Sequence, residues 1–335
     1  MQVAVFSAKS YDRTFLERAA EGTPIRWTFV EARLSAETAI VAEGCDAVCA
    51  FVNDRLDAPA LERLAGHGVR MIALRCAGFN QVDLEAAARL EMSVARVPAY
   101  SPYAVAEHTI GLILSAIRRI HKAYARVREG NFSLDGLLGF DLNGKTAAVV
   151  GTGKIGLLVA KLLHAFGCRV LLYDPYPSEE ASAWGEYVSL DEALSQADVV
   201  TLHCPLTPET RHLIDAATLA RCKQGVTLIN TSRGALVDTR AVIDALKSGK
   251  IGALALDVYE EESELFFENL SDRVIQDDLF TRLLTFPNVV ITSHQAFFTR
   301  EAMEGIAATT VKNLIDFHDG KPLANAVCQQ RIARA

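Results

Sequence analysis

The stretch KTAAVVGTGKIGLLVAKLLHAFGCRVLLYDPY, residues 145–176, decides the fold of this chain. A short apolar run is followed by Gly151, Gly153 and Gly156, then by a helical pattern and a second apolar run. In a G-x-G-x-x-G pattern the first glycine permits a tight turn, the second lets a pyrophosphate approach the backbone, and the third lets helix and strand pack closely. The helix N-terminus offers free N–H groups to phosphate. The stretch therefore predicts a βαβ unit that binds a dinucleotide.

Asp174 ends the second strand of this unit, where a carboxylate can bind the ribose 2′-hydroxyl of a dinucleotide. Its negative charge would repel a 2′-phosphate, so the sequence favours NAD (NADH) over NADP. Two simpler interpretations stay open. Glycines alone often only make turns, and the DPYP sequence also suits Asp174 as a turn residue. The strand, the helix, the spacing and the terminal carboxylate together favour the dinucleotide site.

Length, charge and hydropathy exclude several classes of protein. The chain has 335 residues, enough for two domains, and a net charge of −7 without a basic tract. Neither nucleic acid nor an anionic membrane is therefore an expected partner. No apolar run reaches the roughly 20 residues that span a bilayer. The N-terminus MQVAVFSAKS lacks the features of a signal peptide, so we expect a cytoplasmic protein.

The cysteines predict reduced thiols rather than a disulfide framework or a metal site. None of them forms a C-x-x-C pair, and their number is odd. Several lie in apolar runs, which is typical of buried thiols in a cytoplasmic protein. The positions are Cys45, Cys49, Cys76, Cys168, Cys204, Cys222 and Cys328.

Short β-branched runs alternate with helical patterns along the chain, which indicates parallel βαβ units. The sequence predicts two doubly wound α/β domains with parallel sheets, both of the Rossmann-like or flavodoxin-like kind. We expect an NAD-binding domain over residues 101–297, inserted into a substrate-binding domain of residues 1–100 and 298–335. One helix is expected from Pro102 to about Arg128, and a last helix over about 300–319 should return to the first domain. The expected strands are Gln2–Phe6, Arg26–Val30, Asp46–Phe51, Val69–Leu74, Ser93–Val97, Thr146–Val150, Arg169–Tyr173, Val199–His203, Val226–Asn230, Ile251–Leu256 and Val289–Thr292.

Polar residues follow four of the later predicted strands. In an open parallel sheet, ligands bind beyond the carboxyl ends of the strands, so these residues are candidates for one site. They are His203, Cys204 and Pro205; Thr231, Ser232 and Arg233; Asp257 with Glu260, Glu261 and Glu262; and Ser293 with His294.

The candidates suit the reduction of a 2-oxo acid by a nicotinamide. The carbonyl oxygen needs a proton, which a histidine can give, and a neighbouring carboxylate stabilises the protonated imidazole. The substrate carboxylate needs a bidentate cation, which arginine supplies better than lysine. His294, one of the glutamates Glu260–Glu262, and Arg233 can fill these three roles.

Each residue also has a plainer interpretation. A single histidine at a strand end is often structural, and Arg233 could instead bind a helix end or cofactor phosphates. An acidic run is usually a solvated face. If the run stays extended, Glu260 and Glu262 point to one side, and spacing does not choose between them. His203 is a second candidate acid, although its place before Cys-Pro favours a wall of the cofactor site.

With these residues assembled, the chain resembles the D-isomer-specific 2-hydroxyacid dehydrogenases, and among them the fermentative D-lactate dehydrogenases of bacteria. The resemblance runs nearly end to end and implies the two-domain fold described above. The segments that carry it are FVNDRLD, IALRCAGFNQVDL, VPAYSPYAVAEH, NFSLDGLLGF, VGTGKIG, YDPYP, LHCPLTPET, NTSRGALVD, LDVYEEE, VIQDD and HQAF.

The resemblance implies roles for individual residues. It makes Arg233 the residue that binds and polarises the substrate, His294 the acid/base, and Glu262 its carboxylate partner. Asp257 would lie beside the nicotinamide. The remaining implied cofactor contacts are Lys154, Ile155, Cys204, Pro205, Thr210, Thr231 and Ser232.

The resemblance also implies substrate contacts in the first domain. Backbone amides of the loop Cys76, Ala77 and Gly78 would bind the substrate carboxylate, as a backbone nest can. Tyr100 would border the substrate and the cofactor. Phe51 would lie against the substrate side chain and leave room for little more than a methyl group, unless it is only a core residue.

The sequence thus predicts an NADH-dependent enzyme that reduces pyruvate to D-lactate, without a metal. One alternative is a relative that acts on glyoxylate, hydroxypyruvate or a bulkier 2-oxo acid. Another is an NAD-sensing regulator of the same fold, against which the complete set of Arg233, Glu262 and His294 argues. The resemblance further implies a homo-oligomer, a dimer or a tetramer, associated through the NAD-binding domain.

Overall fold

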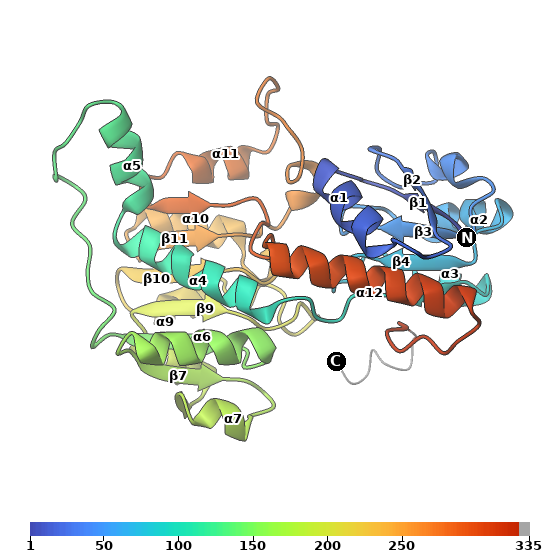
Figure 1. Cartoon of the computed structure of the whole chain (residues 1–335). Helices are drawn as coiled ribbons and strands as arrows, with labels where there is room; N and C mark the ends of the chain where they lie inside the picture. Colours follow the sequence, from blue (N-terminus) through green and yellow to red (C-terminus); the bar gives the residue numbers. More distant parts are fainter. Residues whose placement is uncertain (328–335) are drawn as a thin grey trace. The chain divides into compact units, whose positions relative to one another are not determined.

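The computed structural model describes residues 1–327, which form two compact units (Figure 1). Unit 1 consists of Met1–Ser101 and the segment from Phe298 onward, and unit 2 of Pro102–Phe297. Each unit is built on one all-parallel sheet, which confirms the predicted α/β fold class. Within residues 1–327, no helix is both long enough and apolar enough to span a bilayer. Cys328 lies outside the described residues.

Unit 1 has the strand order β2-β1-β3-β4-β5, the flavodoxin-like order. One face of the sheet is covered by α1 and α12, so the last helix belongs to this unit, and the other face packs on an apolar layer that includes Leu61. The elements are β1 (Gln2–Val5), α1 (Ser10–Ala19), β2 (Arg26–Phe29), β3 (Ala47–Ala50), α2 (Ala58–Gly66), β4 (Met71–Leu74), α3 (Leu84–Arg89), β5 (Ser93–Ala95) and α12 (Arg300–His318), with a 3₁₀ turn η1 at Ala39–Ala42.

Unit 2 has the strand order β12-β11-β10-β9-β6-β7-β8. The chain enters at β6, runs outward to β8, and then crosses back to β9 on the other side of β6. The order therefore reverses between β6 and β9, and this switch point is where open α/β sheets bind dinucleotides. The strands are β6 (Thr146–Val150), β7 (Arg169–Tyr173), β8 (Glu186–Tyr187), β9 (Val199–Leu202), β10 (Val226–Asn230), β11 (Ile251–Leu256) and β12 (Val289–Ile291).

Helices cover both faces of this sheet because its strand residues are apolar on both sides. Ala147 and Val149 of β6 face the layer that contains α4 and α6, and Ala148 and Val150 face the layer of α8 to α11. The helices are α4 (Pro102–Ile117), α5 (Ile120–Arg128), α6 (Lys154–Ala165), α7 (Glu179–Ser182), α8 (Leu190–Gln196), α9 (Ala216–Arg221), α10 (Thr239–Lys247) and α11 (Asp278–Leu284), with 3₁₀ turns η2 (Gly234–Leu236) and η3 (Glu262–Glu264).

Two details of the predicted elements are wrong. The single helix expected from Pro102 to Arg128 is broken into α4 and α5 by Arg119, whose φ is +54°. The segment that returns after α5 crosses the end of α4 at Gly139, where an added Cβ would overlap the Ile117 carbonyl oxygen. No helix breaker marks this point in the sequence. The second error is the omission of β8, which is only two residues long.

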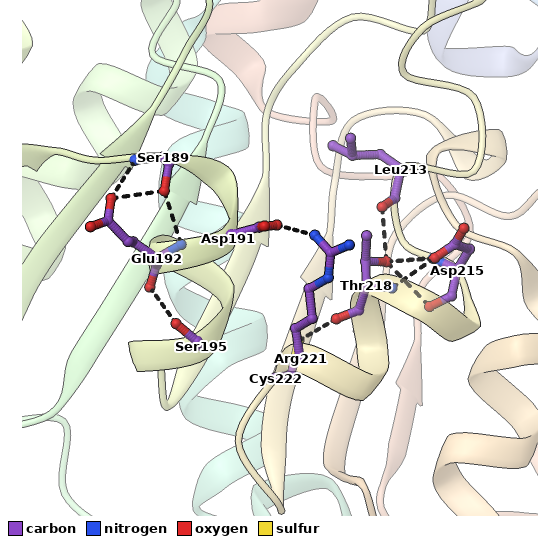
Figure 2. Close-up of polar contacts among 9 residues, drawn as sticks. All are labelled: Ser189, Asp191, Glu192, Ser195, Leu213, Asp215, Thr218, Arg221 and Cys222. Carbon is purple, nitrogen blue, oxygen red and sulfur yellow. Dashed lines mark hydrogen bonds and ion pairs between the residues drawn. The ribbon is translucent and has the colours of Figure 1, made fainter.

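Capping boxes fix the starts of α8 and α9, as Figure 2 shows. Ser189 Oγ accepts the Glu192 amide at 3.2 Å, and the Glu192 carboxylate accepts the Ser189 amide at 3.0 Å. Asp215 and Thr218 make the same reciprocal pair at the start of α9. Each cap stabilises its helix by about 1 kcal/mol. The cap of α9 also fixes the end of the loop that leaves β9 and carries the predicted cofactor residues 203–210.

Candidate active site

The glycine loop after β6 has the geometry that its sequence predicts. Gly151 has a φ of +92°, and a Cβ there would lie 2.5 Å from the Cys204 amide nitrogen. A Cβ on Gly156 would overlap the Gly151 carbonyl oxygen. A Cβ on Gly153, by contrast, would meet nothing within 4 Å, and Gly153 caps α6 without a side-chain hydrogen bond. Open space and uncapped helix amides at Gly153 fit a pyrophosphate, with Lys154 and Ile155 at the start of the helix.

The Asp174 carboxylate holds the glycine loop and the turn after β7. Its Oδ2 accepts the Thr152 amide at 2.7 Å, and its Oδ1 accepts the Tyr176 amide at 2.9 Å. The turn role that the sequence left open is therefore present. The carboxylate can accept further hydrogen bonds, because its two oxygens provide about four acceptor sites. Asp174 can bind a ribose hydroxyl while it keeps these bonds.

His203, at the end of β9, is not suited to give a proton. Desolvation lowers the pKa of His203 to about 3, so the ring is neutral near pH 7. The hydroxyl of Thr201 lies 2.9 Å from its Nε2 and can donate to the neutral ring. The neighbouring Cys204 is buried, which raises the pKa of its thiol to about 11. Both residues therefore fit a neutral wall of the cofactor site.

The loops after β9 and β10 are joined by hydrogen bonds. The Ser232 hydroxyl donates to the Cys204 carbonyl at 2.7 Å. Thr210 Oγ1 donates to the Pro205 carbonyl at 2.7 Å, which closes the loop after β9 on itself. Thr231, buried at the end of β10, has its hydroxyl 2.9 Å from that of Thr109 on α4. These bonds place the predicted cofactor residues at one edge of the sheet, beside the switch point.

Arg233 lies in a tightly fixed loop after β10. The Asn230 side chain donates to the Arg233 carbonyl at 2.8 Å and accepts the Ser232 amide at 3.0 Å. A Cβ on Gly234 would overlap the backbone of Tyr259, so this loop packs directly on the chain that leaves β11. The guanidinium donates to the Ser232 carbonyl at 2.7 Å.

Glu262 and His294 form a hydrogen-bonded pair. Glu262 Oε1 lies 2.8 Å from His294 Nδ1, and Glu262 Oε2 accepts the Tyr259 amide at 2.9 Å. Their side chains are 20% and 18% exposed. Because a carboxylate only accepts hydrogen bonds, Nδ1 must carry a proton. The other ring nitrogen, Nε2, is then the atom available to exchange a proton with a substrate.

The run of glutamates does not continue as an extended strand. The chain turns at residues 260–261 and enters η3 at Glu262, so the alternation considered from the sequence is wrong. Glu260 lies 2.6 Å from His212 Nε2 and accepts a bond from Thr239 at 3.3 Å. Glu261 is exposed. Of the three carboxylates, one is therefore structural, one is solvated, and Glu262 contacts His294.

The backbone at His294 is held in an unusual conformation. Its φ is +53°, in the left-handed region that non-glycine residues rarely adopt. Its amide donates to the Asp257 carbonyl at 2.7 Å. The imidazole contacts two phenylalanine rings, with centroid distances of 5.7 Å to Phe267 and 6.4 Å to Phe297. Phe267 itself has a φ of +68°.

Asp257 is completely buried at the end of β11. Burial alone would raise the pKa of its carboxyl, but hydrogen bonds from His108, Thr292 and the Ala296 amide outweigh that effect and lower the pKa below its usual value. The carboxylate is therefore charged at neutral pH. The sequence placed Asp257 among the candidate site residues but gave no sign that His108 contacts it, because Thr292, the partner of His108, lies 184 positions away.

In unit 1, the predicted substrate residues follow the neighbouring strands β3 and β4. The Phe51 amide donates to Asp54 at 2.6 Å, and the guanidinium of the buried Arg75 lies 4.8 Å from the centre of the Phe51 ring. Arg75 is fixed in turn by Asp12, at 3.1 Å. The Phe51 ring is therefore held from its backbone and from one face.

The predicted anion-binding loop directly follows Arg75. The Cys76 thiol donates to the Gly78 carbonyl at 3.2 Å, which keeps this loop compact. Ala77 lies between them, and its carbonyl accepts a bond from Arg96 at 2.8 Å. Tyr100 lies at the last turn before unit 2, where its backbone packs on Gly305 of α12.

Comparisons with known proteins fit this geometry. The family model described as D-isomer specific 2-hydroxyacid dehydrogenase, NAD binding domain, matches residues 110–296. The D-lactate dehydrogenase of Escherichia coli (strain K12) is 52% identical over 326 residues, which is 97% of this chain and 99% of that enzyme. The chain belongs to the D-isomer specific 2-hydroxyacid dehydrogenases.

Solved structures of this dehydrogenase family share the fold over nearly the whole chain. The apo structure of the E. coli D-lactate dehydrogenase has a TM-score of 0.90 at 49% identity and covers 98% of this chain and 100% of that one. The pyruvate reductase of Chlamydomonas reinhardtii has a TM-score of 0.92 at 45% identity, with 97% and 98% covered. The D-lactate dehydrogenase of Lactobacillus jensenii with NAD⁺ has a TM-score of 0.82 at 31% identity, with 98% and 100% covered.

The chain is therefore an NAD-dependent 2-hydroxyacid dehydrogenase, with NAD(H) as its cofactor. The glycine loop, the uncapped start of α6 and Asp174 fit that cofactor. Among residues 1–327, no three His, Cys, Asp or Glu side chains lie close enough together to hold a metal ion.

Proposed function

We propose that this dehydrogenase reduces pyruvate to D-lactate with NADH. The observation that carries the proposal is the pair of Glu262 and His294, bonded at 2.8 Å through Nδ1 with Nε2 left for a substrate. The names of two relatives support the substrate, since they are a D-lactate dehydrogenase and a pyruvate reductase.

The proposed proton transfer follows from the geometry of the pair. The glycine loop and Asp174 would hold NADH, and the chemistry that NADH would supply when bound is a hydride for the carbonyl carbon of the substrate. His294, protonated on both nitrogens, gives the Nε2 proton to the carbonyl oxygen as negative charge develops there. Glu262 stabilises the imidazolium before the transfer and keeps the ring oriented after it. In the oxidation direction, neutral His294 takes the proton back.

Arg233 is proposed to bind the substrate and polarise its carbonyl group. Arginine presents a planar fork of donors that matches a carboxylate, and its charge persists at any working pH. The fixed loop around Arg233 reduces the ordering that substrate binding requires. Backbone amides of Cys76, Ala77 and Gly78 are proposed to bind the same carboxylate, and Tyr100 to border the substrate.

Phe51 is proposed to limit the size of the substrate side chain. Arg75 and Asp54 hold the ring and its backbone, so the ring cannot easily move to admit a larger group. The natural enzyme should then prefer pyruvate over bulkier 2-oxo acids. A methylene group in an apolar pocket changes kcat/KM by roughly 10-fold to 200-fold.

Phe51→Leu tests this assignment. The smaller side chain should shift the ratio of kcat/KM values toward 2-oxo acids with longer side chains, by about 10-fold or more. The measurement is kcat/KM for NADH oxidation with a series of 2-oxo acids, for both enzymes. An unchanged order of preference would show that Phe51 is a core residue only, and a natural preference for a bulkier acid would overturn pyruvate as the substrate.

Neighbouring glutamates provide a matched test of the proton-transfer pair. Glu262→Gln should lower kcat about 10-fold to 100-fold and end pyruvate reduction at a lower pH, because the imidazolium loses its counter-charge. Glu261→Gln removes an exposed carboxylate one residue away and should leave the profile unchanged. The measurement is kcat against pH for the natural enzyme and both variants. Equal profiles for all three would contradict the pairing.

A homo-oligomer that associates through unit 2 is also proposed. Helix α5 and the segment after it expose large apolar side chains, including Phe132 at 75%, Leu134 at 81% and Leu138 at 91%. Apolar groups at this density usually mark an interface, and a second copy of the chain is the proposed partner. Sedimentation of the double variant Leu134→Asp, Leu138→Asp should show a smaller species than the natural chain. A species of unchanged size would exclude this surface as the interface.

A cytoplasmic location is proposed as well. The cysteines among residues 1–327 are free and buried, which suits a reducing compartment.

A further inference from the structure

We propose that His108 on α4 is a positioning residue for His294, and that it acts through Thr292 and Asp257. The inference rests on the proposed role of His294 as the proton donor. The contacts of His108 in this region are with Thr292 and Asp257, so it is proposed to act on His294 through these two residues. It terminates a chain of hydrogen bonds that fixes the backbone on which His294 stands.

The donor and acceptor of each hydrogen bond between His108, Thr292 and Asp257 follow from counting protons. The Thr292 hydroxyl lies 2.5 Å from Asp257 Oδ1 and 3.2 Å from His108 Nε2. A hydroxyl has one proton, and a buried carboxylate can only accept, so Thr292 donates to Asp257. His108 must then donate from Nε2 to the Thr292 oxygen. The same Nε2 lies 3.5 Å from Asp257 Oδ1, so His108 also faces the carboxylate itself.

Asp257 holds the backbone on both sides of His294. Its carbonyl accepts the His294 amide at 2.7 Å. Its carboxylate accepts the amides of Gln295 and Ala296, each at 2.9 Å. These three bonds enclose the left-handed backbone at His294, which has no glycine to make that conformation easy. The orientation of the imidazole toward Glu262 therefore depends on where the Asp257 carboxylate is held.

His108 and Thr292 hold the Asp257 carboxylate in place from outside the loop that carries His294. Helix α4 packs on β10, β11 and β12, and His108 is the residue through which it bonds to the Thr292–Asp257 pair. The His108 side chain is only 22% exposed, so the bond is shielded from water. His108 faces a buried charge whose other donors are the Thr292 hydroxyl and the amides of Gln295 and Ala296, next to His294.

The loss of His108 should misplace the proton donor without unfolding unit 2. In His108→Leu the Asp257 carboxylate keeps Thr292 and both amides as donors, so its burial remains tolerable. A displacement of about 1 Å at a reacting group can cost on the order of 100-fold in rate. We expect kcat for pyruvate reduction to fall about 10-fold to 100-fold in this variant. His108→Gln, which retains a side-chain N–H donor, should recover most of the rate.

The experiment measures kcat per NADH-binding site, with sites titrated by NADH fluorescence, for the natural enzyme, His108→Leu, His108→Gln and Thr292→Val. Glu107→Ala, an exposed neighbour on α4, is the matched control and should be unchanged. The proposal predicts fewer turnovers per site in His108→Leu and in Thr292→Val, with recovery in His108→Gln. A purely structural role would reduce the number of NADH-binding sites and leave turnover per site unchanged, which would overturn the proposal. If His108→Leu does not fold, Thr292→Val decides by the same criterion.

His294→Ala in the same series distinguishes a failure of the proposed function from a failure of the positioning role of His108 alone. If the natural enzyme does not reduce pyruvate, or if His294→Ala retains full turnover, the proposed function fails. If both of those results are as expected and the His108 and Thr292 variants turn over at the natural rate per site, only the positioning role fails.

Discussion

His294→Ala is expected to lower kcat for pyruvate reduction about 10²-fold to 10⁴-fold, the usual contribution of a positioned general acid. The variant should still bind NADH, because the glycine loop and Asp174 lie on other elements of unit 2. Without the imidazole, the carbonyl oxygen would have to take its proton from water. Stopped-flow turnover and NADH fluorescence titration measure the two properties separately.

A second variant is needed because the backbone at His294 has a left-handed conformation. Alanine is strained at a φ of +53°, so His294→Ala removes the ring and also disfavours the loop conformation. Asparagine tolerates the left-handed region, so His294→Asn removes the acid and keeps the backbone. Both variants should be slow. Loss of NADH binding in both variants would point to a cofactor role for His294. Full turnover in His294→Asn would exclude His294 as the acid.

Arg233→Gln is expected to lower kcat/KM for pyruvate about 10²-fold to 10³-fold. Two charge-assisted hydrogen bonds to a carboxylate contribute roughly 3–4 kcal/mol together, and each 1.36 kcal/mol changes the rate tenfold. Most of the loss should appear as a higher KM, since a carboxylate contact is made in the bound substrate as well as in the transition state. Polarisation of the carbonyl adds a loss in kcat.

Arg211 is the matched control for Arg233. It lies in the same unit and pairs with Glu260 at 3.4 Å, with a side chain that is 57% exposed. Arg211→Gln should leave kcat/KM unchanged, because an exposed ion pair contributes little. Equal effects of the two substitutions on pyruvate kinetics would show that general positive charge, not a specific contact, attracts the substrate. A change in NADH affinity restricted to Arg233→Gln would assign the residue to the cofactor instead.

The sequence predicted the parts of the fold that rest on local patterns. The apolar strands, the glycine loop and the start of α4 at Pro102 each carry their cause within a few residues. The break at Arg119 could not be predicted, because it depends on Gly139 crossing the end of α4 after a long excursion. The two-residue strand β8 has no pattern to detect.

Some residues of the candidate site could be predicted from local sequence patterns, and others could not. Strand ends could be predicted, and so could the set of chemical groups gathered there. The choice among three glutamates could not follow from spacing, since the turn at residues 260–261 replaces the alternation of a strand. Resemblance pointed to Glu262, and the structure places that carboxylate on His294. His108 escaped notice because hydrogen bonds between α4 and the end of β12 leave no trace in local sequence.

The most direct test of the proposed function is the incubation of the purified chain with NADH and pyruvate, followed by chiral analysis of the product. The measurement records NADH oxidation and the amounts of the two lactate enantiomers. We expect oxidation of NADH to yield D-lactate in equal amount, without L-lactate. L-lactate, or no turnover of pyruvate at any pH between about 5 and 8, the range over which a histidine changes its charge, would contradict the proposed function.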